Sequence, residues 1–221
     1  AVDQGWDWAY GLLHQQGRMH EDIMAFPAKH FYQGQLTTLL PKQLEVEYLL
    51  ETTDGGQSGH MSALSTKRVL YLPASQSSLG FHKMNDIEAE LIKNILLDLY
   101  DLYTKSGRNL EAASIGIITP FRAQIVNISN LLDTLPFKLD ITVDTVERFQ
   151  GGAKDIIILS MVVSSPGQLQ AIVSQNKEGI DRKMIVALTR GKERLIMVGN
   201  KEVLSSAAFY KEFIEEYEEN V

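Results

Sequence analysis

An almost unbroken apolar run from Ile156 to Val163 is the sequence feature that most constrains the fold. A strand that is apolar along its length is typical of a parallel sheet with both faces covered. Other short apolar runs alternate with segments whose apolar residues recur at helical spacing. This alternation predicts an α/β fold, with a mostly parallel sheet and helices on both faces. We expect strands at 115–119, 141–143, 156–163 and 195–198, and helices at 87–103, 122–132 and 209–217.

Three segments of the N-terminal half are harder to assign. Residues Glu21 to Phe31 have a helical pattern but contain Pro27, so we expect a broken or short helix there. Lys67 to Leu72 predicts an additional strand. Between them, Thr52 to Thr66 is rich in Gly, Ser and Thr, which predicts a flexible surface loop. We expect residues 1–221 to form a single domain.

Composition excludes several kinds of site. The chain has no cysteine, which rules out disulfides and thiolate metal ligands, and its five histidines are scattered, so no metal site is expected. The net charge of −7 argues against a protein that coats nucleic acid by bulk charge, but not against a local groove. No apolar run is long enough to span a membrane and no secretory leader is visible. We therefore expect a cytoplasmic chain without a membrane partner.

Thr119 and Pro120 follow a predicted strand and begin a predicted helix. In parallel sheets, ligands bind at the carboxyl edge of the strands, and helix N-termini bind phosphate groups. This position makes Thr119 a candidate contact for a backbone phosphate of nucleic acid. The alternative is an ordinary helix start, with an N-cap followed by proline.

Thr145 begins a turn that ends with Gln150, Gly151 and Gly152, between two predicted strands. The threonine hydroxyl and exposed backbone N–H groups can hold a phosphate, and glycines allow the backbone to approach it closely. The alternative is a crossover segment that simply ends in a glycine turn. The residues alone favour neither interpretation.

Two arginines are candidates for phosphate chemistry. Arg190 ends a helix-like segment just before Gly191, where it can act as an arginine finger on a phosphate held by another domain. Its alternative role is an interaction with the dipole of its own helix. Arg18 lies in a polar turn before a helix, and its alternative role is a surface ion pair with Glu21 or Asp22.

The order of these motifs carries more information than any one of them. The strings QGRMH, ITPFRAQ, VDTVERFQG and VALTRGKERLIMVGN resemble the second RecA-like domain of superfamily-one helicases. The closest branch includes the nonsense-mediated-decay RNA helicase and the Okazaki-fragment nuclease-helicase, which have Q-Y-R-M-H, I-T-P-Y, T-V-D-x-F-Q-G-R-E and V-A-L-T-R-A. The resemblance extends from Gln16 to Asn200, nearly the whole chain.

The resemblance implies the motor domain of an ATP-dependent DNA or RNA helicase. In that family ATP and Mg²⁺ are held mainly by a first domain, which carries a P-loop that this chain lacks. Arg18 and Arg190 match the two arginines that neutralise γ-phosphate charge. Thr119 and Thr145 match positions that contact the backbone of single-stranded nucleic acid. The turn at 150–151 matches one that lies, in the family, between the nucleic-acid strand and ATP. The expected partners are therefore single-stranded nucleic acid and the first RecA-like domain of the same protein.

The sequence departs from the family pattern at three places. Gly17 replaces a tyrosine that can stack on the base, and Gly152 and Ala153 replace an Arg-Glu pair whose glutamate contacts the nucleotide. Gly191 replaces the alanine after Arg190, a change expected to have little effect. The alternative role is thus a degenerate domain that binds nucleic acid or docks a protein without catalysis. In either case the isolated chain is predicted not to hydrolyse ATP.

Overall fold

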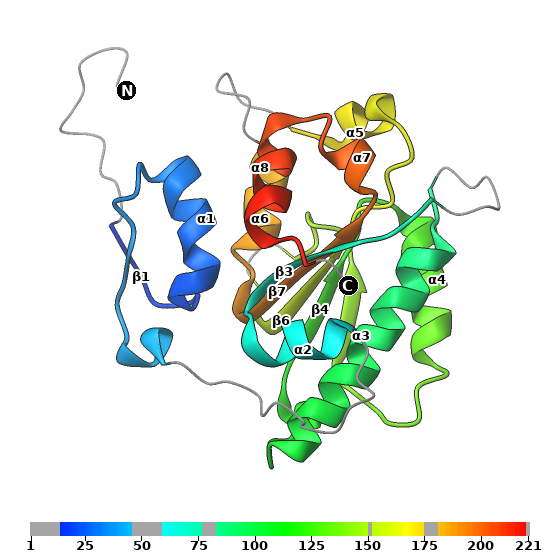
Figure 1. Cartoon of the computed structure of the whole chain (residues 1–221), viewed down its shortest axis with the longest axis horizontal. Coiled ribbons are helices and arrows are strands. Elements are labelled where there is room, and N and C mark those ends of the chain that lie inside the picture. The colour runs from blue at the N-terminus through cyan, green and yellow to red at the C-terminus, as the bar shows by residue number, and fades with distance from the viewer. Residues whose placement is uncertain (1–13, 46–58, 77–82, 150–151, 175–180, 220–221) are drawn as a thin grey trace.

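A five-stranded parallel sheet forms the centre of the computed structural model (Figure 1). The structure describes residues 14–45, 59–76, 83–149, 152–174 and 181–219. The strands lie in the order β3-β7-β6-β4-β5, and each neighbouring pair is parallel. This topology confirms the predicted α/β fold with a parallel sheet. The strands are β3 (Val69–Pro73), β4 (Ile115–Ile118), β5 (Ile141–Asp144), β6 (Lys154–Ser160) and β7 (Gly191–Gly199).

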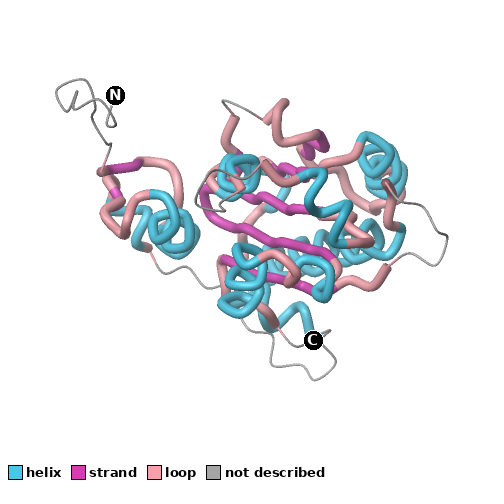
Figure 2. The backbone as a smooth tube through the Cα atoms, turned by 90° about the horizontal axis from the view of Figure 1, so that it is seen from above, coloured by secondary structure: helices cyan, strands magenta, loops and turns pink. Residues whose placement is uncertain are grey.

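Helices cover both faces of the sheet, as the view from above shows (Figure 2). One hydrophobic core lies under α1, α5, α6, α7 and α8, and a second lies under α2, α3 and α4. The 3₁₀ helices η3 (Pro41–Leu44) and η4 (Leu110–Ala112) and the short pair of strands β1 (Gln15–Gln16) and β2 (Thr37–Thr38) complete the fold. The helices are α1 (Glu21–Phe31), α2 (Gly59–Thr66), α3 (Asp86–Lys105), α4 (Arg122–Leu132), α5 (Pro166–Ile172), α6 (Arg182–Leu188), α7 (Lys201–Leu204) and α8 (Ala208–Tyr217).

Strand β6 explains the continuous apolar run in the sequence. Successive side chains of a strand point to opposite faces of the sheet. Ile156 and Ile158 accordingly belong to the core under α3, whereas Ile157 and Leu159 belong to the core under α1 and α6. Since both faces are buried there, the four consecutive positions from Ile156 to Leu159 are all apolar.

The prediction of a broken or short helix at residues 21–31 is wrong. Helix α1 is continuous and contains Pro27 in its interior. A proline there costs about 3 kcal/mol, because it removes one backbone hydrogen bond and crowds the preceding turn. Burial of the apolar face offsets this cost: Phe26 is only 1% exposed and makes edge-on ring contacts with Phe209 and Phe213 of α8.

The predicted flexible loop at 52–66 is wrong for its second half, because residues Gly59 to Thr66 form α2. Leu64 of this helix is fully buried. The Arg194 Nη1 atom donates hydrogen bonds to the carbonyl oxygens of Leu64 (2.6 Å) and Lys67 (2.9 Å), and so caps the end of the helix from β7. Residues 52–58 lie outside the described part of the chain.

Glu218 and Glu219 lie along β3, which is an edge strand of the sheet. Glu218 forms a parallel bridge with Tyr71, and the Glu219 N–H donates to the Tyr71 carbonyl oxygen (3.2 Å). Two lysines hold this segment, since Lys201 pairs with Glu218 (2.6 Å) and Lys67 pairs with Glu219. The outer edge of β3 is therefore partly covered by the chain itself.

Candidate functional site

The predicted nucleic-acid contacts lie together at the carboxyl edge of the sheet. Thr119 and Pro120 directly follow β4, and Thr145 directly follows β5, the neighbouring strand. The Thr119 N–H donates to the carbonyl oxygen of Asp144 (3.2 Å), which fixes the two strand ends side by side. This is the edge at which ligands bind in open parallel sheets.

The two threonines differ in exposure. Thr145 is partly exposed, and its N–H donates to the Asp144 side chain (2.8 Å). Thr119 is fully buried, and its Oγ1 atom has no hydrogen-bond partner among the described residues. A buried hydroxyl without a partner is costly and requires an explanation in a native structure. The Thr119 hydroxyl can therefore meet a ligand only through a cavity.

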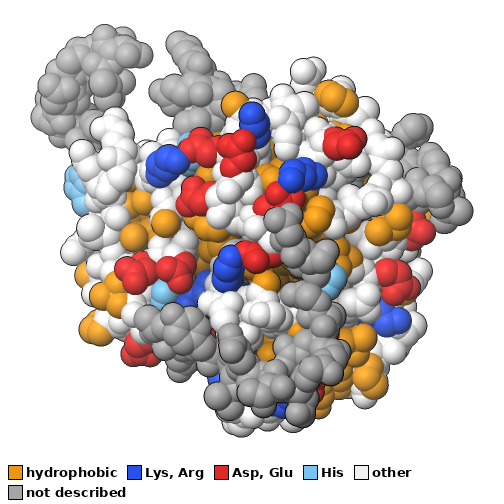
Figure 3. Space-filling view, in the orientation of Figure 1, with side chains coloured by type: hydrophobic (Ala, Val, Ile, Leu, Met, Phe, Trp, Pro, Cys, Tyr) orange, Lys and Arg blue, Asp and Glu red, His pale blue; other side chains and the backbone are white. Residues whose placement is uncertain are grey.

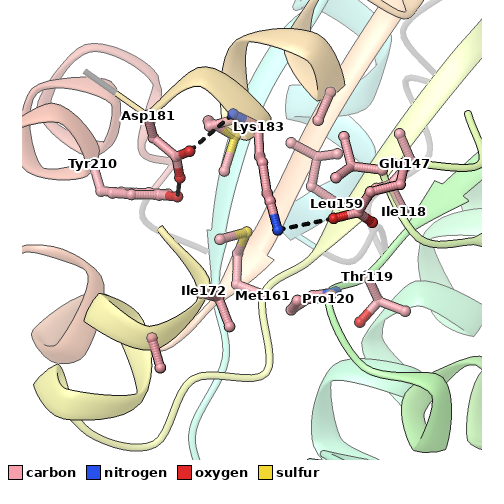
Figure 4. Close-up of a pocket in the computed structure, with 14 residues that line it drawn as sticks. Ile118, Thr119, Pro120, Glu147, Leu159, Met161, Ile172, Asp181, Lys183 and Tyr210 are labelled. Carbon is pink, nitrogen blue, oxygen red and sulfur yellow. Dashed lines mark hydrogen bonds and ion pairs between the residues drawn. The ribbon is translucent and has the colours of Figure 1, made fainter. Parts of the chain in front are cut away.

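Such a cavity, of about 160 Å³, opens beside Thr119 (Figure 4). The Lys183 Nζ atom of α6 and the Glu147 carboxylate form an ion pair across it at 2.9 Å. This pair is the largest cause of a lowered pKa of Glu147. The remaining walls are mostly apolar and come from β4, β6, α5, α6 and the segments that follow β4, β5 and β6: Ile118, Pro120, Val146, Leu159, Met161, Ala171, Ile172, Met184 and Ala187.

Arg18 and Arg190 lie side by side at the opposite, amino edge of the sheet. Arg190 immediately precedes β7, and the Arg18 Nη1 atom donates to the carbonyl oxygen of Thr189 (3.1 Å). The Arg190 Nη1 atom donates to the carbonyl oxygen of Gly152 (3.1 Å). Three segments that were singled out from the sequence thus meet here. The two other predicted members of the turn, Gln150 and Gly151, lie outside the described residues.

Neither arginine has a carboxylate ion pair among the described residues. Burial lowers the pKa of Arg190, and the nearby charge of Arg18 lowers it further. Arg190 also contacts its own helix, because its Nε atom donates to the carbonyl oxygen of Val186 (3.1 Å). Arg18 makes no surface pair with Asp22, whose side chain lies instead near His20 and Arg68. Two adjacent positive charges without a balancing acid are stabilised by an anion.

Hydrogen bonds around Gln16 and His20 position Arg18. The Gln16 Oε1 atom accepts from the N–H groups of Arg18 and Met19, both at 2.8 Å. The N–H of His20 donates to the carbonyl oxygen of Lys192 (2.8 Å), which attaches the turn to the start of β7. The turn that carries Arg18 is therefore fixed against the strand that follows Arg190.

Asp181 positions α6, the helix that ends before Arg190. Its carboxylate caps the helix by accepting from the Lys183 N–H (3.0 Å), and it also accepts from the Tyr210 hydroxyl (2.7 Å) of α8. Asp181 was not among the site residues predicted from the sequence. An aspartate before an apolar helical pattern is an N-cap signal that could have found it, whereas nothing in the sequence indicates its contact with Tyr210.

A second buried polar cluster lies behind the carboxyl edge, around Glu88. Its carboxylate accepts from the Ser160 hydroxyl (2.8 Å) and from the N–H of Val162 (3.1 Å), which has a left-handed φ of 50°. Such a φ is strained for a β-branched residue. Burial raises the pKa of Glu88 to about 7, although hydrogen bonds from Ser160, Val162 and Asn85 favour the charged form. No pattern in the sequence indicates this cluster.

Charge and composition set further limits on the site. Lys and Arg side chains are intermixed with Asp and Glu on the face shown in Figure 3. Such a face suits recognition of an anion by a few local groups rather than by a large positively charged surface. Within the described ranges, no three His, Asp or Glu side chains gather as a metal site would require. None of the helices in those ranges is long and apolar enough to cross a membrane.

Comparisons with known proteins agree with the motif order. A family model described as an AAA domain matches residues 2–202. The chain is 30% identical over 219 residues to the DNA polymerase alpha-associated DNA helicase A of Saccharomyces cerevisiae, covering 95% of this chain and 30% of that protein. It is 29% identical over 216 residues to a Regulator of nonsense transcripts 1 homolog of Arabidopsis thaliana, covering 94% and 16%. It is 31% identical over 205 residues to the DNA replication ATP-dependent helicase/nuclease DNA2 of Xenopus laevis, covering 83% and 18%. The chain thus spans less than a third of the length of these relatives.

Proposed function

The chain belongs to the AAA-domain family, as a C-terminal domain of superfamily-one helicases, and we propose that it is the second motor domain of an ATP-dependent DNA or RNA helicase. In this role it supplies Arg18 and Arg190 to ATP bound by a separate P-loop domain. It also contacts the backbone of single-stranded nucleic acid at the carboxyl edge of its sheet. The proposal assigns each of these tasks to a different edge of the same sheet.

The observation that carries the proposal is the convergence of the two arginines. Arg18 donates to the carbonyl oxygen of Thr189, directly beside Arg190, and no carboxylate in the described structure neutralises either charge. A planar guanidinium donates several N–H groups in a fixed fork that suits phosphate oxygens. A pair of them fits a triphosphate tail well.

ATP supplies a phosphoryl group on which negative charge develops as its bond to the leaving oxygen breaks. In our proposal Arg18 and Arg190 donate hydrogen bonds to that group and stabilise the charge. The carbonyl oxygens of Thr189 and Gly152 hold the two guanidinium groups in place beforehand. This chain offers neither a P-loop nor a cluster of acids in its described part, so we assign the bound Mg²⁺ to the partner domain.

The carboxyl edge is proposed as the path of the nucleic acid. Thr119, Pro120 and Thr145 lie on neighbouring strand ends, and Thr145 presents a partly exposed side chain with a hydroxyl group there. Contacts of this kind are made mainly to phosphates and sugars, which carry no sequence information directly. We therefore expect binding with weak sequence preference.

The decisive experiment is ATP hydrolysis stimulated by single-stranded nucleic acid, measured on a protein in which a P-loop domain accompanies this chain. Arg190→Ala is expected to lower the turnover number about a thousandfold, as for loss of an arginine finger. The matched control is Arg182→Ala, an exposed arginine at the other end of the same helix. It is expected to leave turnover unchanged.

The second candidate function is a non-catalytic module for binding nucleic acid or docking a protein. Gly17 and Ala153 favour it, because they remove an aromatic and an acidic contact that the family pattern has near the nucleotide. The same experiment separates the two candidates. If the original protein and Arg190→Ala have equal ATP turnover, the motor role is contradicted and the non-catalytic module is the candidate that remains.

A further inference from the structure

We propose that the cavity beside Thr119 binds a single base of the nucleic-acid strand, turned out of the strand, and that it prefers a pyrimidine. This inference rests on the proposed function, because it places the strand at the carboxyl edge of the sheet. It adds a contact to a base where the proposed function requires only contacts to the backbone. The support comes from the size of the cavity, its walls and its polar groups.

The size of the cavity matches one six-membered ring. Its volume is about 160 Å³. An apolar protein cavity of about 150 Å³ is known to take up a benzene molecule. A pyrimidine has one ring of that size, whereas a purine has two fused rings. The volume therefore favours cytosine, thymine or uracil over adenine and guanine.

The walls suit the flat face of a ring. Leu159 of β6, Met161 just after that strand and Met184 of α6 are buried and line the cavity, and Ile172 of α5 points toward it (Figure 4). Methionine sulfur makes favourable contacts with aromatic rings, and its flexible side chain adapts to their position. Proteins that bind flipped bases hold them between apolar and aromatic side chains in the same way.

The polar groups suit the edge of a base rather than a purely apolar ligand. Thr119 is one of the residues that line the cavity, and its buried Oγ1 atom has no partner among the described residues; a hydroxyl can both donate and accept. Lys183 and Glu147 add a donor and an acceptor beside it. Their side chains are about half exposed, so their mutual attraction is weak and they can turn toward a ligand. Asp181 and Tyr210, by contrast, already satisfy each other.

The inference can be tested with this chain and two DNA strands of equal length, one of thymidines and one of abasic sites. Both have the same phosphate backbone, so only a base contact distinguishes them. Binding is measured by fluorescence anisotropy at one fixed salt concentration. We expect the thymidine strand to bind about tenfold more tightly, as for one buried base. A deoxyadenosine strand is expected to bind less tightly than the thymidine strand.

A matched pair of variants locates the contact. Ala171 is an exposed residue of α5 that lines the cavity, and Gln170 is its exposed neighbour that does not. Ala171→Trp is expected to fill the cavity and to reduce the affinity for thymidine to that for abasic DNA. Gln170→Trp is expected to retain the tenfold difference. Binding of the abasic strand by Ala171→Trp shows at the same time that this variant is folded.

The outcomes separate this inference from the proposed function. Equal affinity of the unchanged chain for thymidine and abasic strands overturns the base pocket and leaves backbone binding intact. A difference that persists in Ala171→Trp overturns the location of the contact at this cavity. Equal affinity for deoxyadenosine and thymidine overturns the preference for a pyrimidine. A chain that binds none of the strands overturns both the pocket and the proposed path of the nucleic acid.

Discussion

Arg18 donates a hydrogen bond to the carbonyl oxygen of Thr189 and so lies beside Arg190, although one residue is near the start of the chain and the other near its end. The contact joins the turn before α1 to the end of α6. Each guanidinium is also held by a backbone carbonyl, not by an acid. No carboxylate of the described residues pairs with either arginine, so within that part of the chain the positive charges are positioned without being neutralised.

The first prediction concerns this pair. In a protein that includes a P-loop domain, Arg18→Ala and Arg190→Ala are each expected to lower ATP turnover strongly, by about a thousandfold for Arg190. The double variant is expected to lose little more than the worse single variant, because both groups act on the same developing charge. Turnover of all four proteins in a double-mutant cycle measures this. Losses that simply multiply would show that the two arginines act independently.

The second prediction concerns Gly191. From the sequence we expected glycine at this position to have little effect, whereas the structure shows that a larger residue does not fit there without strain. A Cβ atom at residue 191 would lie 2.9 Å from the carbonyl oxygen of Arg194, which is backbone and cannot move aside. The strand register shifts at this point, between the pairs of Lys154 with Gly191 and Ile156 with Arg194. Gly191→Ala is expected to lower the free energy of unfolding by about 1–3 kcal/mol, measured by chemical denaturation.

The control for this substitution is Gly167→Ala in α5. Apart from its chain neighbours and its own helix backbone, no described residue has an atom within 4 Å of a Cβ placed there. The substitution is therefore expected to leave stability unchanged or to raise it by up to about 1 kcal/mol, since alanine favours helices. If Gly191→Ala were as stable as Gly167→Ala, the close approach to Arg194 would not constrain residue 191.

A third prediction follows from the buried carboxyl group of Glu88. Its pKa rises from 4.5 to about 7 on folding, mainly because of burial. Between these two pH values the folded chain keeps a proton that the unfolded chain releases. The free energy of unfolding is therefore expected to fall as the pH rises from about 4.5 to 7, by about 3 kcal/mol in total. Denaturation series at several pH values measure the slope.

Two variants of α3 isolate this contribution. Glu88→Gln carries no titrating group and is expected to lose this part of the slope, whatever its effect on overall stability. Glu90→Gln, an exposed position on the same helix, is expected to keep it. An identical slope in Glu88→Gln and Glu90→Gln would contradict the raised pKa of Glu88.

Most of the sheet and the long helices could be predicted from the sequence, because local patterns determine them. The apolar spacing from Ile87 to Tyr103 predicted α3, and Pro120 correctly marked the end of β4. The same logic placed Thr119 after a strand, at the carboxyl edge of the sheet. The proximity of Arg18 to Arg190, in contrast, was implied only by the resemblance to a family, because no local pattern joins residues so far apart.

The errors and omissions have tertiary causes. Pro27 remains in a helix because α8 buries the rings beside it, and α2 is helical because Arg194 caps it from a distant strand. In the sequence, Glu88 is indistinguishable from any acidic residue near the start of a helix. Only in the folded chain is its carboxylate surrounded by hydrogen-bond donors. Contacts of this kind depend on which elements become neighbours, and single-sequence patterns do not report that.

The C-terminal segment along β3 also limits how copies of the chain can associate. An uncovered edge strand invites another chain to add to the sheet, and charged residues on it oppose such growth. Here Glu218 and Glu219 occupy that margin of β3 and are each tethered by a lysine. A second copy would have to displace two anchored carboxylates before it could extend the sheet, so this side of the molecule resists polymerisation.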